Sequence, residues 1–515
     1  MKPESRRWAV LAVLCLSLLV VSIDNTILNV ALPTLVRTLG ATPQQLQWIV
    51  DSYTLVFAGL LLTSGRLGDR FGRRGVMTTG MVIFGAGSLA ASLSGSADAL
   101  IVWRGVMGIG AALILPATLS ILVNVFTEPR QRRRAIAYWT LMNATGSFIG
   151  PVAGGLLLRH FWWGSVFLVN VPVIVIALSL QRAVVPTSRD PGAGRFDFAG
   201  AGLSTLALAA LLFAVIEGPS YGWGSPAILA GFAVAVVALV WFVRWEQRCV
   251  SPMLDLAVFR APQLTAAAVA TTIAFMAMIG SMFLVGQSLQ LVKGYAPLTA
   301  ALATSGPITT TNFITMPLAP RLTERIGARW MIAVGIGFIA LAAVVISLIT
   351  VQSGYLNLFI GFVLMATAFS IFVPASTEAI MTAVPKEKAG GASAINQTTR
   401  QLGQALGIAV SGSIAAAAYV SSFTLAGTGV SSTDAQTAGE SITGALTVAN
   451  RLHGAAHDAV VAAANTAFID GVRLAIVVSA VVAAGCAVFA ALAIPGQRRV
   501  RSPVEAVIEV ETVVS

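Results

Sequence analysis

The charged residues inside the long apolar runs of this chain include Asp24, Asp51 and Arg104. A charged side chain near the centre of a bilayer costs about 2.5–3.5 kcal/mol even on lenient scales, so such residues pair, face a cavity or exchange protons. At about 1.5 Å of rise per helical residue, the three lie at similar depths from the ends of their runs. Burial raises the pKa of a carboxyl group and a nearby cation lowers it. A contact with Arg104 that forms and breaks would therefore switch the protonation of a carboxylate.

Each charged residue also has a less active interpretation. Asp24 could form an inert buried ion pair, and Asp51 could be a helix-end charge among lipid headgroups. We expect Arg104 to tune a neighbouring carboxylate and not to bind a ligand directly. Glu378, about seven residues before Pro385, is either a second proton or cation site or an interfacial charge.

The composition indicates a membrane protein. Of the 515 residues, 57% are hydrophobic and only 10% are charged, whereas soluble chains carry about 25% charged residues. Disordered chains are excluded because they are poor in apolar residues. A bilayer-spanning helix needs about 20 apolar residues. We identify fourteen such runs, so the chain is predicted to be an all-α polytopic membrane protein; the runs lie at 8–32, 46–64, 75–94, 98–124, 134–158, 162–181, 198–217, 225–243, 262–290, 298–317, 330–350, 355–383, 390–420 and 467–494.

The basic residues form short clusters between these runs. Most clusters fall on alternate connections, which the positive-inside rule assigns to the cytoplasm. This pattern predicts a multi-pass membrane protein with both termini cytoplasmic. The net charge of +11 is spread over these clusters, so it does not indicate a nucleic-acid surface.

Sequence signals for a metal, a cofactor or a nucleotide are missing. The three cysteines are far apart, and no phosphate-binding G-x-x-x-x-G-K-[ST] motif occurs. His453 and His457 have i,i+4 spacing, but a solvated helical face explains them better than a metal site. Asp470 and Arg473 are expected to form a local i,i+3 pair. We therefore expect no cofactor and an ion gradient as the energy source.

An internal repeat predicts the domain organisation. The segments 65–74 and 320–329 both read x-R-L-x-(D/E)-R-(apolar)-G-x-R, after the second and the tenth run. These positions are equivalent if two six-helix bundles flank two inserted helices, a 6+2+6 arrangement with parallel pseudo-symmetry. The predicted domains are 1–182, 183–260 and 261–515. The last would include an extracellular loop at 421–466 and a cytoplasmic tail.

Two groups of residues are candidates for gating. Gly146, Gly150 and Gly154 form a smooth stripe that allows close helix approach, and Pro151 permits a bend. We interpret the stripe as a seam between the bundles, with ordinary helix packing as the alternative. Asp69 precedes the third helix, whose N-terminal dipole favours an anion. The arginines near it could pair across the bundles as a latch, or only set topology; this second group is Gly65, Asp69, Arg70 and Arg73.

Several motifs resemble one family of transporters. The segments 23–33, 146–155 and 162–172 resemble the first-, fifth- and sixth-helix motifs of the 14-helix drug:proton antiporters. Segment 65–74 is similar to the loop signature of the major facilitator superfamily, to which these antiporters belong. The sequence departs from the family at Met107, where the fourth-helix motif usually has Gln. It also places Asn312 where some pumps for multivalent cations carry an acid.

The resemblance implies a major facilitator fold and a proton-coupled multidrug efflux transporter, an antibiotic-resistance protein and not an enzyme. Protons and lipophilic or cationic drugs and dyes would be its partners, with the chain a monomer. The expected proton-coupling residues are Asp24, Asp51, Arg104 and Glu378. The expected drug-binding residues are Asp24, Trp48, Trp139, Asn143, Phe148, Phe283, Asn312 and Phe313, although each aromatic could instead pack in the core or face lipid.

Other functions remain as alternatives. The nearest is an exporter dedicated to one natural product, antibiotic, siderophore or lipid. A sugar symporter is disfavoured because the fifth-helix stripe resembles that of exporters. A membrane enzyme would use paired acids, which Asp24 and Asp51 could imitate, and a receptor would bind ligand without proton-dependent flux.

Overall fold

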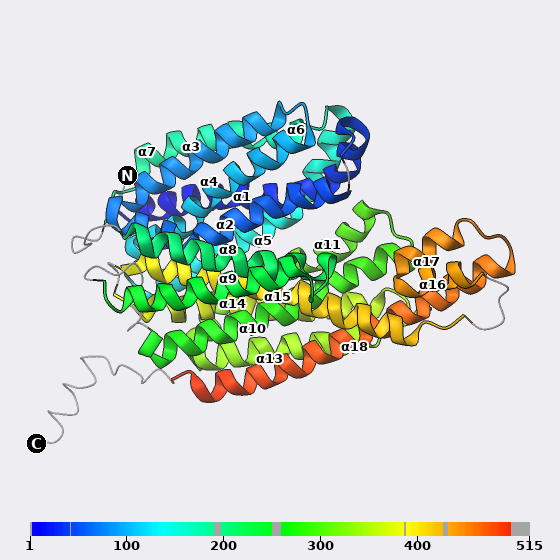
Figure 1. Cartoon of the computed structure of the whole chain (residues 1–515). Coiled ribbons are helices and arrows are strands. Elements are labelled where there is room, and N and C mark those ends of the chain that lie inside the picture. The colour runs from blue at the N-terminus through cyan, green and yellow to red at the C-terminus, as the bar shows by residue number, and fades with distance from the viewer. Residues whose placement is uncertain are drawn as a thin grey trace, which may run out of the picture.

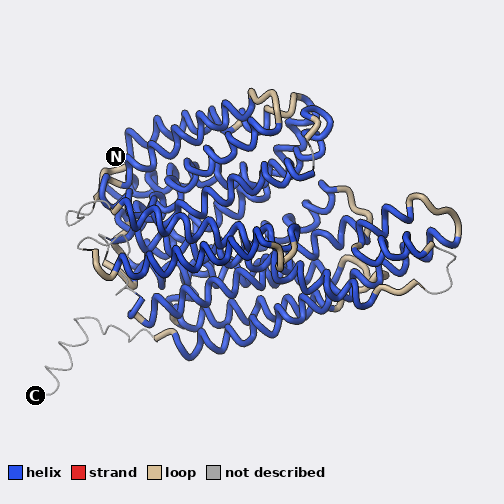
Figure 2. The backbone as a smooth tube through the Cα atoms, viewed as in Figure 1, coloured by secondary structure: helices blue, strands red, loops and turns tan. Residues whose placement is uncertain are grey.

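The computed structural model describes residues 3–41, 43–189, 197–249, 259–385, 388–425 and 431–495. Within these ranges every regular element is a helix (Figures 1 and 2). The helices run side by side in two groups, with α8 and α9 beside them, and α1 begins and α18 ends at the same end of the molecule (Figure 1).

The elements follow the predicted 6+2+6 order. The N-terminal bundle consists of α1 (Pro3–Leu39), α2 (Pro43–Phe71), α3 (Arg73–Ser92), α4 (Ala97–Val125), α5 (Pro129–His160), the short α6 (Ser165–Leu168) and α7 (Asn170–Val184). The inserted pair is α8 (Phe198–Tyr221) and α9 (Pro226–Glu246). The C-terminal bundle consists of α10 (Pro262–Gln287) with its π-helical end η2 (Ser288–Val292), α11 (Pro297–Thr315), the 3-10 turn η3 (Met316–Leu318), α12 (Ala319–Ile326), α13 (Ala328–Ser347), α14 (Leu356–Thr382), α15 (Ala389–Ser422) and α18 (Ala455–Ala493).

The helices are long and apolar enough to cross a membrane. Among the described residues, 13 spans satisfy both criteria, and α6 with α7 forms one of them. The tenth predicted run corresponds to α11, which is not among the 13. Eight of its 19 residues are Thr, Ser or Asn, and these lower its mean hydropathy. Every predicted run therefore contains a helix.

The repeated motif ends in the same backbone geometry in both bundles. Gly72 precedes α3 with φ of 102°, and Gly327 precedes α13 with φ of 84°. The amide of each donates to a carbonyl four residues earlier, that of Gly68 or Thr323. Only glycine adopts positive φ readily, so the two glycines of the repeat end a helix and redirect the chain alike. This geometry supports the pseudo-symmetry.

The inserted helices contact both bundles. A buried apolar cluster joins α8 to α2 and α15 through Ala58, Leu212, Val215, Ala405 and Ala409. At its N-terminus, α8 is capped by Asp197, whose carboxylate accepts from the Gly200 amide at 2.9 Å and from the Trp245 indole of α9. Helix α8 is thus positioned at the junction between the bundles.

The predicted loop 421–466 is largely helical. It contains α16 (Ser432–Glu440) and α17 (Ile442–Ala449), and α18 begins at Ala455, twelve residues before the predicted start. At about 1.5 Å per residue, the 39 residues of α18 span about 58 Å, longer than the roughly 30 Å hydrocarbon core. Its first part projects beyond the bundle with α16 and α17, at the right of Figure 1. The helices were not predicted because the segment is rich in Ser, Thr, Ala and Gly and contains no long apolar run.

Three smaller predictions concern residues near α18. Asp470 and Arg473 form the expected i,i+3 pair, with Oδ1 and Nη1 3.7 Å apart. His453 is exposed, whereas His457 is partly buried with Nδ1 2.9 Å from the Ala449 carbonyl. No cluster of three or more His, Cys, Asp or Glu is found in the part of the chain that the structure describes.

Close packing of α10 against α15 yields a first prediction. An added Cβ at Gly407 would meet the backbone of Met276 and of Gly280. Backbone atoms cannot rotate away, so we expect Gly407→Ala to lower the free energy of unfolding by about 1–3 kcal/mol. Thermal unfolding in detergent measures the change. Gly286→Ala, also helical but with open space for a Cβ, is the control and should not lower the melting temperature. Equal effects of both changes would contradict the packing argument.

Candidate functional site

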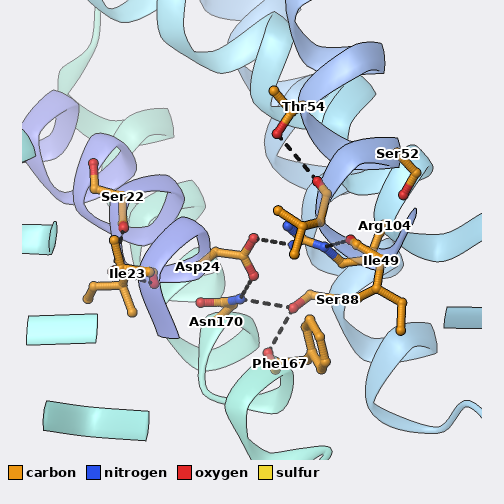
Figure 3. Close-up of polar contacts among 12 residues, drawn as sticks. Ser22, Ile23, Asp24, Ile49, Ser52, Thr54, Ser88, Arg104, Phe167 and Asn170 are labelled. Carbon is orange, nitrogen blue, oxygen red and sulfur yellow. Dashed lines mark hydrogen bonds and ion pairs between the residues drawn. The ribbon is translucent and has the colours of Figure 1, made fainter. Parts of the chain in front are cut away.

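Asp24 and Arg104 form a fully buried ion pair (Figure 3). The Arg104 Nη1 lies 2.6 Å from Asp24 Oδ2, and both side chains are at most 2% exposed. Asp24 comes from α1 and Arg104 from α4, so the pair joins two helices of the N-terminal bundle. Its opposite charges compensate each other where neither could be solvated by water.

A polar network holds the second carboxylate oxygen of Asp24. Asn170 of α7 donates from Nδ2 to Asp24 Oδ1 at 3.0 Å and to Ser88 Oγ at 3.1 Å. Ser88 in turn donates to the Phe167 carbonyl at 2.7 Å (Figure 3). Asn170 was not among the predicted site residues. The only signal in the sequence was that Asn170 is a polar residue within an apolar run. Asn and Gln side chains are common in helices, and their spacing does not show which charged group they contact.

Arg104 is fixed by two further contacts. Its Nε donates to the Ile49 carbonyl at 3.1 Å, and its guanidinium lies over the Tyr53 ring, with Cζ 4.3 Å from the centroid. Both partners belong to α2, so Arg104 links α1, α2 and α4. Of the three charged residues predicted to lie together, the structure therefore joins Asp24 and Arg104.

A cavity of about 1310 Å³ lies between the bundles. It is lined by α1, α2, α4, α5 and α8 on one side and by α10, α11, α14 and α15 on the other, and it reaches residues 440–443 beside α17. The wall is largely apolar, as is usual for sites that take drug-sized ligands. Six predicted site residues line it: Asp51, Arg104, Asn143, Phe148, Phe283 and Asn312.

Four predicted drug-binding residues do not line this cavity. Asp24 is 0% exposed and engaged with Arg104, so it does not face a ligand here. Trp139 is fully buried and donates its indole N–H to Thr118. Trp48 stacks on Phe213 of α8 with centroids 6.4 Å apart. Phe313 is 50% exposed on the outer surface, because it follows the inward-facing Asn312 by one residue, about 100° around the helix.

Two carboxylates line the cavity: Asp51, on α2, and Glu440, at the end of α16. Of these, Asp51 is the one on the N-terminal bundle. It lies within electrostatic range of Glu217 of α8, and Gln47 donates to Glu217 Oε2 at 3.0 Å. Glu217 is 1% exposed. Sequence reasoning missed Glu217, since it stands at the end of an apolar run and resembles a headgroup-level charge.

The C-terminal wall of the cavity carries Arg400, on α15. Its side chain is buried, and Cζ lies 4.9 Å from the centroid of the Phe275 ring. Gln397 and Asn312 line the cavity with it. Arg400 stands inside an apolar run, which is the signal that selected Asp24, but no acidic residue lies near it in the sequence.

Asp69 connects the two bundles at the arginine-rich end, where α1 begins and α18 ends. The carboxylate of Asp69, on α2, accepts from the amides of Gly390 and Gly391 at 3.0 and 3.1 Å. It also pairs with Arg73 at 2.7 Å. The prediction that Asp69 faces the dipole of α3 is therefore wrong. The carboxylate instead lies at the N-terminus of α15, in the opposite bundle. Close approach is possible because Gly65 packs directly on the backbone of Gly390.

The second copy of the repeat makes the reciprocal connection. Glu324 of α12 stands at the position equivalent to Asp69, and its Oε1 lies 3.4 Å from Nη2 of Arg133, near the start of α5. Glu378 lies 3.5 Å from Nη1 of Arg133, so the structure places it at this end and not in the cavity. In each copy an acid reaches the beginning of the fifth helix of the opposite bundle. We call these contacts, made by Asp69, Gly390, Gly391, Glu324, Glu378 and Arg133, the cross-bundle latch.

The glycine stripe packs within one bundle. Added Cβ atoms at Gly146, Gly150 and Gly154 would meet residues 19–30 of α1. The interpretation as a seam between bundles is therefore wrong, and ordinary close packing of α5 on α1 is correct. Direct contact of α5 with the C-terminal bundle is made instead through Ala137 and Leu141, which meet Met316. The stripe still serves the site, because it holds the helix of Asp24 firmly.

The cavity does not extend to the cross-bundle latch. No lining residue belongs to the latch segments 65–74, 319–329 or 378–391. The structure is therefore closed at the arginine-rich end and hollow from its middle towards α16 and α17.

Comparisons with known proteins agree with this arrangement. The Major Facilitator Superfamily profile matches residues 14–408. The chain is 35% identical over 495 residues to the multidrug efflux pump LfrA of Mycolicibacterium smegmatis, covering 96% of this chain and 97% of LfrA. It is 35% identical over 474 residues to the methyl viologen resistance protein SmvA of Salmonella typhimurium (90% and 93%). It is 36% identical over 395 residues to a methylenomycin A resistance protein of Streptomyces coelicolor (76% and 82%).

The fold also resembles a solved structure. The human organic anion transporter MFSD10 superposes with a TM-score of 0.63 at 13% identity, covering 94% of this chain and 99% of that one. At this identity the likeness concerns the fold alone.

The chain belongs to the Major Facilitator Superfamily, as its motifs predicted. It is a multi-pass membrane transporter, and the relatives above are named as a multidrug efflux pump and as proteins of resistance to methyl viologen and to methylenomycin A.

The cross-bundle latch gives a second prediction. Asp69→Ala removes the acceptor of two α15 amides and the carboxylate that pairs with the buried Arg73, and breaking a buried pair of this kind costs about 3–5 kcal/mol. The arginine-rich end should open more often. Spin labels at Phe71→Cys and Leu322→Cys, in a background without native cysteines, should report a longer distance population. Asp98→Asn, at the opposite end and bonded to Gln45, is the control. Identical distance distributions would contradict this role.

Proposed function

We propose that this transporter exports lipophilic, often cationic, compounds in exchange for protons, by alternating access of the cavity to the two sides of a bacterial inner membrane. The observation that carries the proposal is the dry Asp24–Arg104 pair beside a cavity between two latched bundles. Similarity to multidrug pumps over nearly the whole chain supports export. The basic connections support a cytoplasmic arginine-rich end, with the chain acting as a monomer.

The ion pair supplies a physical link between protonation and conformation. Arg104 lines the cavity, whereas Asp24 lies behind it. A proton that neutralises Asp24 leaves the buried Arg104 without its counter-charge, which is unfavourable by several kcal/mol. The arrangement held by Arg104 then no longer has its main electrostatic support, and helices α1, α2 and α4 can shift. Loss of the proton restores the pair, so each conformation prefers one protonation state.

Asp51 is the counter-charge for a cationic compound in this proposal. It faces the cavity, whereas Asp24 does not. Glu217 adds a second negative group within its electrostatic range, which favours cations over neutral compounds. Aromatic side chains on both walls, Phe148 and Phe283, offer apolar and cation–π contacts.

The energetics favour more than one proton per cycle. A proton moving down one pH unit releases about 1.4 kcal/mol. Exchange of one monovalent cation for one proton moves no net charge, so the membrane potential, about 2.3 kcal/mol per charge per 100 mV, contributes nothing. A second proton would use both terms, and Asp51 is the group placed to carry it.

A dedicated exporter of one natural product is the second candidate. It is favoured by the relative named for resistance to a single antibiotic, methylenomycin A. A panel of dyes and antibiotics separates the two functions, since a dedicated exporter moves one compound strongly and the rest weakly.

A third prediction tests proton coupling. Asp24→Asn preserves shape but removes the titratable group, so pH-gradient-driven dye export in inverted vesicles should be abolished. In the wild type, a protonophore should have the same effect. Folding is checked by gel filtration and by retained dye binding. Asp470→Asn, which alters an exposed local pair, is the control and should export normally. Wild-type export by Asp24→Asn would reject the assignment.

A fourth prediction concerns cation recognition. Asp51→Asn removes the cavity-facing charge, and loss of one charge-assisted contact costs about 1.5–3 kcal/mol. Affinity for a cationic dye should fall about 10- to 100-fold, while an uncharged lipophilic dye should bind as before. Equilibrium binding by fluorescence anisotropy measures both. An equal loss for the two dyes would mean that Asp51 supports the structure and does not recognise charge.

A further inference from the structure

The C-terminal wall of the cavity contains a buried cation without a counter-ion. Arg400 is 6% exposed, and its Nη1 has no hydrogen-bond partner. No carboxylate of the described residues forms an ion pair with it; its described contact is the face of Phe275. A guanidinium inside a membrane protein is costly unless an anion or water compensates it. Arg104, the other cavity-lining arginine, has its carboxylate, whereas Arg400 has none.

Two further donors without partners line the same cavity as Arg400. Gln397, one turn earlier on α15, is 4% exposed and its Nε2 is unpaired. Asn312 of α11 is 0% exposed; its Oδ1 accepts from Ser370 at 2.8 Å, and its Nδ2 is unpaired. Buried polar groups are paired in nearly all cases. Three unpaired donors on one wall are an arrangement that an anion would satisfy.

We propose that Arg400, Gln397 and Asn312 form a subsite for a carboxylate on the transported compound. A planar guanidinium matches the two oxygens of a carboxylate, and Phe275 would hold it in orientation. Asp51 lines the same cavity from the N-terminal bundle, so a lipophilic zwitterion would satisfy both charges. The inference rests on the proposed export function for its cargo, but binding at the subsite requires no proton gradient.

A matched dye pair tests the subsite. Rhodamine 110 carries a free carboxylate, and rhodamine 123 is its methyl ester with the same cationic ring system. Anisotropy titrations use the full chain in lipid nanodiscs without a gradient. Arg400→Gln should weaken rhodamine 110 binding about 10- to 100-fold and change rhodamine 123 binding less than about twofold. Asp51→Asn should weaken both dyes alike. Selective loss in Arg400→Gln without dye export by the wild type would refute the proposed function and leave the subsite standing.

Two controls separate recognition from structural damage. Arg400→Gln removes an uncompensated buried charge, so without ligand its melting temperature should be no lower than that of the wild type. Gln397→Leu should weaken rhodamine 110 selectively but less strongly. Gln404→Leu, on the same helix and also lining the cavity, should affect both dyes equally. If Arg400→Gln fails to fold, Gln397→Leu tests the subsite instead: selective loss of rhodamine 110 binding supports it, and equal loss of both dyes overturns it.

Competition identifies the source of the anion. Benzoate should displace rhodamine 110 from the wild type and not rhodamine 123, whereas chloride at the same ionic strength should displace neither. Displacement by chloride but not by benzoate would make this an inorganic anion site and overturn the proposal. Equal losses of both dyes in Arg400→Gln, no loss, or no binding of rhodamine 110 to the wild type would also overturn it.

Discussion

An isolated charge is expensive inside a membrane protein, and the placement of each buried charge in this chain follows from that cost. Asp24 and Arg104 compensate each other completely, with Asn170 and the Ile49 carbonyl satisfying remaining polar atoms. A buried ion pair of this kind is poor evidence for a stable fold, because apolar residues of similar size in its place often stabilise a protein equally well. Its physical value is that removing one charge makes the other unfavourable, and the proposed mechanism uses this to couple a proton to helix position.

The free-energy cost of an isolated buried charge also explains the contacts at the closed, arginine-rich end of the molecule. The cross-bundle latch places Asp69 on the α15 amides and Glu324 on Arg133, so each bundle offers an acid to the fifth helix of the other. Partial positive charge at the start of α15 and the full charge of Arg133 serve equivalent roles. Because these contacts are polar, water can replace their hydrogen bonds when the bundles separate.

The cavity carries different charges on its two walls. The N-terminal wall presents Asp51, with Glu217 of the inserted helices behind it. The C-terminal wall presents Arg400 on α15, and Glu440 lines the cavity at the end of α16. The inserted helices therefore contribute to the chemistry of the cavity through α8 and do not only widen the protein. An amphiphilic compound with both charges would be oriented across the cavity, whereas a simple cation would use one wall.

Hydrophobic run lengths and the repeated motif determined the number of membrane spans and their order, because each span must satisfy its backbone within the helix and each repeat ends with a glycine. The motif segments indicated the superfamily. The apolar runs also identified Asp24 and Arg104 as candidate site residues, because a charged residue in an apolar run can be recognised from the sequence alone. Spacing could not show that Asp24 is dry, that the stripe at Gly146 faces α1, or that Phe313 faces outward. Those outcomes depend on the rotation of each helix about its axis, which packing against neighbours decides. Only the tertiary structure shows that no carboxylate among the described residues pairs with Arg400, because the absence of a partner depends on all the surrounding helices together.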